Sequence, residues 1–249
     1  MKEFNFEYDE RYSLVVKANE LIQKSRFNLS TQQQKMILYL ISQINQNDDE
    51  FKLYKFKVKD FCKLCDIKSD SGTIYQQLRE QIKTISDKSL WIRLENGKDT
   101  LLRWIEKPYI DENSGTIEIK LDRDMKPFLL QLKENFTQYE LAYTLRFKSK
   151  YSIRLYEYIQ SVHYNKMEQY KHTISVDELK TLLNAEKYEI FRDFNSRVLK
   201  TALKEINEYS DKRIDIEYIK ENRKVISIKF IIETKDSVET YIINRDFKR

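Results

Sequence analysis

The chain has 249 residues, of which 41% are hydrophobic, and this excludes a disordered protein and allows two domains with separate cores. Its 45 basic and 40 acidic residues give a net charge of +5, which predicts nucleic-acid binding only where cations concentrate locally. The acidic start over 1–10 is unlike a secretion signal, no apolar stretch is long enough to cross a membrane, and two cysteines build no disulfide framework, so we expect a soluble cytoplasmic protein with no membrane partner.

The first half of the sequence predicts helices followed by a β-hairpin. Ser30 and Gln33 form an S-x-x-Q capping box that opens a helix reaching Ile44. Asn96-Gly97 tolerates positive φ and therefore predicts a tight turn between two strands. The other elements expected here are a strand over 14–16, a helical turn over 19–23, helices over 58–64 and 73–86, the hairpin strands over 90–94 and 100–105, a strand over 116–121 and a closing helix over 122–133.

The second half repeats this order. An offset of 118 residues carries the apolar stripe of the helix after Ser30 (Ile37, Leu40, Ile41, Ile44) onto Leu155, Tyr158, Ile159 and Val162, and also carries Val58, Phe61 and Leu64 onto Val176, Leu179 and Leu182. An offset of 120 carries Ile74, Leu78 and Ile82 onto Phe194, Val198 and Ala202. A capping box at Ser175 and Glu178 and strands over 214–219 and 225–232 complete the unit.

A repeated helix–helix–helix–hairpin unit is the order of a winged helix, in which the third helix enters the DNA major groove. We therefore expect an α+β fold of tandem winged-helix domains arising from internal duplication, predominantly helical with β-hairpin wings. The first domain would span 1–142 and serve dimerisation and DNA contact. The second would span 143–249 and carry the main DNA recognition, with a partly helical connection over 134–150.

The segment 191–209 is the best candidate for a recognition helix. Its apolar residues recur at helical spacing and share one stripe: Phe191, Phe194, Val198, Ala202 and Ile206. The opposite side carries Asp193, Ser196, Arg197, Lys200 and Lys204. Arg and Ser side chains reach base edges and Lys neutralises phosphate, so this face suits a major groove. An ordinary solvated helix face is the alternative.

Three further groups of polar and basic residues accompany this helix. Each group alone is typical of a solvated surface, and the convergence of the two basic runs on one unit, the second, favours DNA contact. They are Gln76, Arg79 and Lys83 beside the acidic Glu80 in the first unit; Arg146, Lys148, Lys150 and Arg154 at the entry to the second unit; and Lys220, Arg223, Lys224 and Lys229 on the second hairpin.

The sequence offers little for catalysis. His163 and His172 are the only histidines and do not form the H-x-H site of a DNA-nicking initiator, and no phosphate-binding P-loop occurs. Cys62 and Cys65 form a lone C-x-x-C pair, which favours buried thiols over a zinc site. We therefore expect no catalytic residue, no metal and no cofactor. Trp91 and Trp104 are expected to pack rather than to stack on bases.

Three segments resemble the initiator proteins of theta-replicating, iteron-containing bacterial plasmids. They are ANELIQKSRFNLSTQQQKMILYLISQI (18–44), LRFKSKYSIRLYEYIQ (145–160) and FNSRVLKTALKEINEYSD (194–211). The resemblance implies two winged-helix domains that bind repeated origin sequences as a monomer, and a dimer that in several members represses its own gene. By position it places Arg192, Asn195, Arg197 and Lys200 near bases or phosphates, and Lys150 and Arg154 on the backbone.

These observations predict a sequence-specific double-stranded DNA-binding protein that initiates plasmid replication. It would bind origin repeats, recruit the host replication initiator and helicase, and exist as a homodimer in equilibrium with a monomer. A winged-helix transcriptional repressor without a replication role is the alternative, which direct repeats supporting replication in cis would exclude. A cryptic nicking or polymerising enzyme is a third possibility, testable by DNA nicking or nucleotide hydrolysis.

Overall fold

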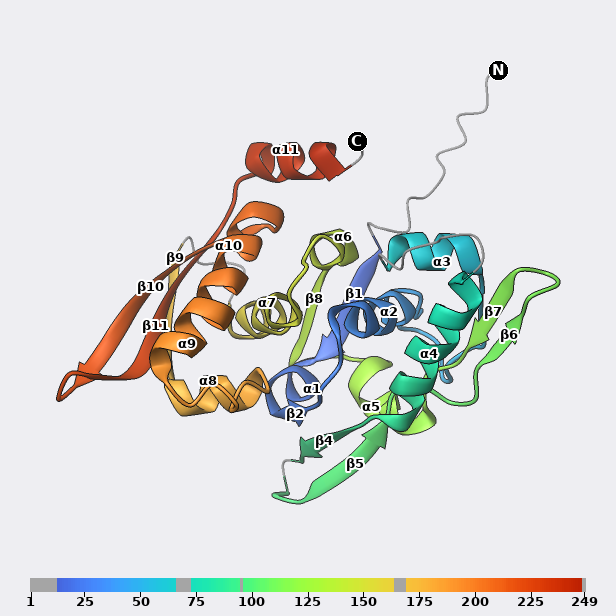
Figure 1. The fold of residues 1–249 in the computed structure, drawn as a ribbon, viewed down its shortest axis with the longest axis horizontal. Coiled ribbons are helices and arrows are strands. Elements are labelled where there is room, and N and C mark those ends of the chain that lie inside the picture. Colours follow the sequence, from blue (N-terminus) through green and yellow to red (C-terminus); the bar gives the residue numbers. More distant parts are fainter. Residues whose placement is uncertain (1–12, 66–72, 95, 164–168, 248–249) are drawn as a thin grey trace.

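The computed structural model describes residues 13–65, 73–94, 96–163 and 169–247, so the acidic start lies outside the described residues. Two helix-rich units lie on either side of a central pair of strands (Figure 1). The first half contains β1 (Leu14–Ala18), α1 (Asn19–Lys24), β2 (Ser25–Arg26), α2 (Thr31–Ser42), β3 (Tyr54–Lys57), α3 (Val58–Leu64), α4 (Ile74–Asp87), β4 (Ser89–Arg93), β5 (Asp99–Arg103), β6 (Tyr109–Asp111), β7 (Thr116–Ile119) and α5 (Lys126–Leu129). The second half contains β8 (Phe136–Glu140), α6 (Leu141–Leu145), α7 (Lys150–Val162), β9 (Gln169–Ser175), α8 (Val176–Leu182), α9 (Phe191–Phe194), α10 (Lys200–Tyr209), β10 (Lys212–Glu221), β11 (Lys224–Thr234) and α11 (Ser237–Phe247).

Both units have the predicted helix–helix–helix–hairpin order, so the tandem winged-helix fold is confirmed. The first unit uses α2, α3, α4 and the hairpin β4–β5, and the second uses α7, α8, α9–α10 and the hairpin β10–β11. Local signals placed these elements correctly. Both capping boxes form: Ser30 Oγ accepts from the N–H of Gln33, and Ser175 Oγ accepts from the N–H of Glu178. Gly97 takes a φ of 78°, as the Asn-Gly turn requires.

The two units are joined by two strands and two short helices that are related by an approximate twofold axis. β1 and β8 pair antiparallel, with the middle residue of one, Val16, opposite the middle residue of the other, Gln138. A short helix follows each strand, and each of these helices crosses to the other unit: α1 packs against α7, and α6 packs against α2. The units therefore share strands and helices and are held in one orientation (Figure 1).

The first long helix is a central helix rather than a surface one. Its residues 33–41 are buried without interruption, although the sequence predicted a single apolar stripe. The reason is that β1, α4, α6 and α7 surround α2 on several sides. Ile44, expected in the stripe, lies beyond the helix end at Ser42 and packs against the core from the following loop.

In the middle of the chain the structure corrects one expectation and adds detail to two others. The closing helix over 122–133 is wrong in extent, because only a 3-10 turn over Arg123–Met125 and the short α5 form there. The expected strand over 116–121 is present as β7, which pairs with β3 and β6. The expected connection over 134–150 contains β8 and α6, and the expected boundary after Ala142 falls inside α6. The position of the domain boundary remains a prediction.

Candidate nucleic-acid interface

The recognition helix of the second unit is interrupted by a π-helical turn. Between α9 and α10 the residues Asn195–Leu199 form one wide turn, in which the N–H of Lys200 donates to the carbonyl oxygen of Asn195, five residues back. The wide turn brings a further residue to the buried side, because Val198 and Leu199 are both fully buried. Phe191, which the sequence placed in the buried stripe, is only half-buried. Such π turns recur at functional sites. The buried stripe is Phe194, Val198, Leu199, Ala202, Leu203 and Ile206.

The opposite side of this helix is open to solvent, as predicted. Arg192 is 83% exposed and forms an ion pair with Asp193 at 3.6 Å, too exposed to restrain either side chain strongly. Asn195 is half-buried, and its Oδ1 accepts a hydrogen bond from the hydroxyl of Tyr218 on β10 at 2.9 Å. The exposed residues of this face are Arg192, Ser196, Arg197, Lys200 and Lys204.

The equivalent helix of the first unit, α4, presents a weaker cationic face. Gln76, Arg79 and Lys83 are exposed on the side opposite the buried residues Ile74, Leu78, Ile82 and Ile85. Arg79 forms an ion pair with Glu112, from the turn between β6 and β7, and Glu80 is exposed beside it. The two carboxylates offset much of the positive charge, so this helix offers polar contacts more than a strong attraction for phosphate.

The second wing carries its cations at its tip. Arg223 and Lys224 are exposed at the turn between β10 and β11, where Asn222 and Arg223 take φ values of 45° and 69°. Positive φ at both central residues is the geometry of a tight two-residue hairpin turn. Lys229, farther down the wing, is paired with Glu217 at 2.8 Å. The free positive charge is therefore concentrated at the tip.

Arg154 is buried rather than presented at the surface, contrary to the expectation that it holds a phosphate. The side chain is only 5% exposed. Its Nη2 atom donates to the carbonyl oxygens of Ile22 and Ser25 at 3.2 Å each, and to that of Leu182 at 3.3 Å. The guanidinium also lies over the ring of Phe27, 4.4 Å from its centre. Arg154 thus ties the first unit to the second from inside the junction.

The neighbouring cations divide into two kinds. Lys148 is exposed, and its backbone N–H donates to the carboxylate of Glu205 at 3.1 Å, which fixes the loop before α7. Arg146 instead lies over the ring of Tyr209 at 4.4 Å and donates to the carbonyl oxygen of Ile243. Of Lys148 and Arg146, Lys148 is therefore the candidate phosphate contact, because its side chain is exposed to solvent.

A cluster of lysines at the junction was not foreseen. Lys150 is half-buried and donates to Oδ1 of Asn28 at 2.8 Å. Its pKa is lowered by burial and, to a smaller extent, by the charges of Lys187 and Lys88. These three lysines, called the junction lysines below, come from α7, from the loop before α9 and from the end of α4. They are distant in the sequence, so no local pattern could reveal them.

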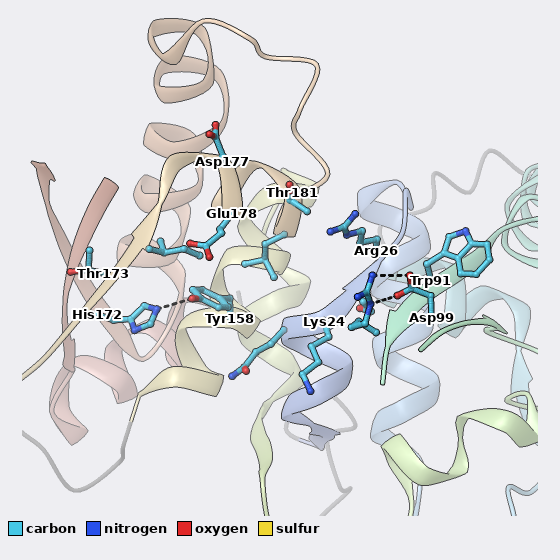
Figure 2. A pocket seen from close by; sticks show the side chains of 15 residues that line it. Lys24, Arg26, Trp91, Asp99, Tyr158, His172, Thr173, Asp177, Glu178 and Thr181 are labelled. Carbon is cyan, nitrogen blue, oxygen red and sulfur yellow. Dashed lines mark hydrogen bonds and ion pairs between the residues drawn. The ribbon is translucent and has the colours of Figure 1, made fainter. Parts of the chain in front are cut away.

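A cleft of about 920 Å³ opens between the first wing, α1 and the start of α8 (Figure 2). Its charged lining is balanced between cations and carboxylates, so it lacks the excess of positive charge found on the exposed face of α9–α10. Trp91 lines this cleft with 52% of its surface exposed, which corrects the expectation that it packs; Trp104 is buried, as expected. The charged residues of the lining are Lys24, Arg26, Arg93, Asp99, Asp177 and Glu178.

The cysteines behave as structural thiols. Cys62 and Cys65 are both buried, and burial raises the pKa of Cys62 to about 11 and that of Cys65 further. Across the described ranges, no group of three or more His, Cys, Asp or Glu residues is placed to hold a metal ion. Within the same ranges, no helix combines the length and apolarity needed to span a membrane.

The chain is similar to known replication proteins over most of its length. Residues 14–160 match the family model described as Initiator Replication protein, WH1, and residues 175–232 match Initiator Rep protein, WH2. A replication initiation protein of Escherichia coli is 27% identical over 88% of this chain and 69% of its own length. The PI protein of Escherichia coli is 28% identical over 72% of this chain and 68% of its own. A crystal structure of Pi initiator protein in complex with iteron DNA has the same fold, with a TM-score of 0.73 at 23% identity, covering 91% of this chain and 99% of that one.

Proposed function

The chain belongs to the family of initiator replication proteins, and from that premise we propose that it binds repeated double-stranded DNA sequences at a plasmid origin and initiates replication there. The similar Pi initiator, crystallised with iteron DNA, supports this proposal. One observation carries it: the exposed face of α9–α10 concentrates Arg, Lys, Ser and Asn opposite a fully buried stripe. A helix of this kind, followed by a basic wing, is suited to the major groove.

The two recognition helices divide the work of binding. In the second unit, Arg192, Asn195, Ser196 and Arg197 are placed for base edges, and Lys200, Lys204, Arg223 and Lys224 for phosphates. In the first unit, Gln76, Arg79 and Lys83 make a second, weaker set of contacts. Because β1 pairs with β8 and fixes the units, both helices dock as one body in successive grooves, about 34 Å apart.

The junction lysines are suited to the stretch of backbone between the two grooves. They lie at the end of α4 and ahead of α9, which are the ends of the recognition helices that approach the junction. The charges of Lys88 and Lys187 lie close enough to lower the pKa of Lys150, and like charges held this close favour a bound anion. Lys148 extends this surface. We expect substitution of Lys88 and Lys187 by Ala to reduce the salt dependence of DNA binding by about one unit of slope for each lost phosphate contact.

Recruitment of host proteins and repression by a dimer are both functions of a protein that acts by binding. The protein has no need of chemistry of its own if it opens replication by recruiting the host replication initiator and helicase to the origin in the bacterial cytoplasm. A homodimer, formed through the first domain and in equilibrium with the DNA-binding monomer, would repress the protein's own gene. Association of the dimer and recruitment of the helicase are measurable with the purified chain.

The decisive experiment is footprinting of the purified chain on the DNA that flanks its gene, followed by a test of that DNA for replication in cis. Protection of direct repeats that support replication when the protein is supplied is the expected result. Protection of an operator without replication would instead establish a winged-helix transcriptional repressor. Nicking of the DNA would overturn the proposal of a protein that acts by binding.

A further inference from the structure

Tyr218 on the second wing is fastened to the recognition helix from two directions. Its hydroxyl donates to Oδ1 of Asn195 at 2.9 Å. Its ring meets the ring of Phe191 edge-on, with centres 5.5 Å apart and planes at 86°. Tyr218 is 37% exposed and stands on β10 opposite Ile228, which is fully buried in the wing sheet. The paired strand β10 thus holds a side chain whose hydroxyl bonds to the amide of Asn195.

In the structure the oxygen end of the Asn195 amide is the one bound to the wing, which leaves the nitrogen end available. An asparagine amide has an oxygen that accepts and a nitrogen that donates two hydrogens, and its two orientations are otherwise similar in energy. The tyrosine hydroxyl donates to the oxygen, so the oxygen faces the wing and the nitrogen faces away from it. Asn195 also begins the π turn, so the helix backbone holds its position against Tyr218.

Base edges in the major groove distinguish between these two ends. A freely turning asparagine pairs with adenine through both atoms, accepting from N6 and donating to N7. An amide whose oxygen is held toward the wing presents its N–H donors to the base edge. It therefore favours an edge made of acceptors, which is the O6 and N7 edge of guanine or the O4 of thymine.

We propose that Tyr218 is a positioning residue for sequence specificity: it orients the Asn195 amide so that its nitrogen selects an acceptor-bearing base at one position of the DNA site. This inference rests on the proposed function and extends it from binding to the reading of one base. Tyr218 acts through Asn195, so removing its hydroxyl is expected to change the preference at that base and leave the general attraction for DNA as it was.

The test uses the full chain and a random double-stranded DNA library. The sequences selected by the wild-type protein, by Tyr218→Phe and by Asn195→Ala are compared, and affinities are then measured for single-base variants of the wild-type selection. The phenylalanine keeps the ring contact with Phe191, so the fold is preserved. Tyr170→Phe, on β9 at the other edge of the same three-stranded sheet, is the matched control for loss of a tyrosine hydroxyl.

We expect Tyr218→Phe and Asn195→Ala each to reduce the discrimination between bases by about fivefold or more, at the same single base pair. In Tyr218→Phe the freed amide should also bind sites with adenine at that position better than the wild-type protein does. Tyr218→Phe should add nothing once Asn195 is Ala, because the two residues then act as one unit. Unchanged selection by Tyr218→Phe, or equal weakening on every sequence, overturns the inference. If the wild-type chain itself selects no sequence, the proposed function fails instead, and the two failures are thereby distinguished.

Discussion

Lys17 of β1 and Glu157 of α7 form an ion pair inside the junction of the two units, with Nζ and Oε1 2.7 Å apart and both side chains 2% exposed. The hydroxyl of Tyr139 on β8 donates to the same carboxylate at 2.8 Å. Burial lowers the pKa of Lys17 even though Glu157 faces it, because loss of hydration outweighs the attraction. The pair therefore specifies how the units fit together more than it stabilises them.

Removing one partner of this pair should be costly. Glu157→Gln leaves the Lys17 ammonium buried without a countercharge, and we expect a loss of about 3–5 kcal/mol in the free energy of unfolding, measured with denaturant. Adding Lys17→Met should recover much of that loss. Glu118→Gln, which breaks the exposed pair with Lys55, is the control and should cost less than about 1 kcal/mol. Equal losses of stability in Glu157→Gln and Glu118→Gln would contradict the description of Lys17 and Glu157 as a buried ion pair.

Arg154 and Lys148 should separate stability from DNA binding. Arg154→Ala leaves three buried carbonyl oxygens without their donor, and we expect a loss of at least about 2 kcal/mol of folding stability. The molecules that remain folded should bind DNA with an unchanged salt slope. Lys148→Ala should do the opposite, with stability within about 0.5 kcal/mol of wild type and a shallower slope. Thermal unfolding and titrations at two salt concentrations measure both properties.

The exposed face of the recognition helix should matter for DNA and little for folding. Arg197→Ala and Lys200→Ala remove exposed side chains and no core. A base contact would cost about 1–3 kcal/mol and relax one position of the site, whereas a phosphate contact would weaken all sequences alike. Glu208→Ala, exposed at the far end of α10, is the control for a charge change on this helix. Normal binding by both variants in a mobility-shift assay would refute the assignment of this helix.

The buried face should give the reverse pattern. Val198 is fully buried within the π turn, so Val198→Asp places an unpaired carboxylate in the core. This should cost several kcal/mol, which is about half of the free energy of unfolding of a small domain. We expect loss of cooperative unfolding of the second unit in circular dichroism rather than a selective DNA defect. Val198→Ile controls for the change of side chain without a charge. A soluble Asp variant that melts normally would show that the face is assigned in reverse.

Both histidines should make the protein less stable in mild acid. Burial lowers the pKa of His163, with a smaller effect of Lys212 near its Nδ1 atom, and burial also lowers the pKa of His172. Below the ordinary value of 6.5 the unfolded chain therefore binds protons that the folded chain does not, so stability falls with pH from 6.5 to the folded pKa values. Scanning calorimetry at pH values from 7 to about 5.5 should show the decline. The variant His163→Gln with His172→Gln should show a flatter profile, and a wild-type profile without slope would exclude this linkage.

Much of the fold could be predicted from the sequence because its signals are local. The capping boxes at Ser30 and Ser175 and the turn at Gly97 depend on neighbouring residues, and these formed where expected. The apolar period of α4 also identified its buried residues Ile74, Leu78 and Ile82, since a helix that packs on one side shows its burial in its spacing. The second recognition helix was located for the same reason.

The remaining features depend on contacts between distant residues. The pairing of β1 with β8 turned an expected connection into part of the core. The packing of α1 against α7 buried Arg154, although Lys148, close to it in the sequence, is exposed. The sequence alone determined two winged-helix units and the amphipathic helix that we propose faces DNA, because amphipathic period and capping are properties of short segments. Only the tertiary structure decided which cations remain exposed, and that Tyr218 holds Asn195, because burial and side-chain orientation are set by the elements that pack around a residue.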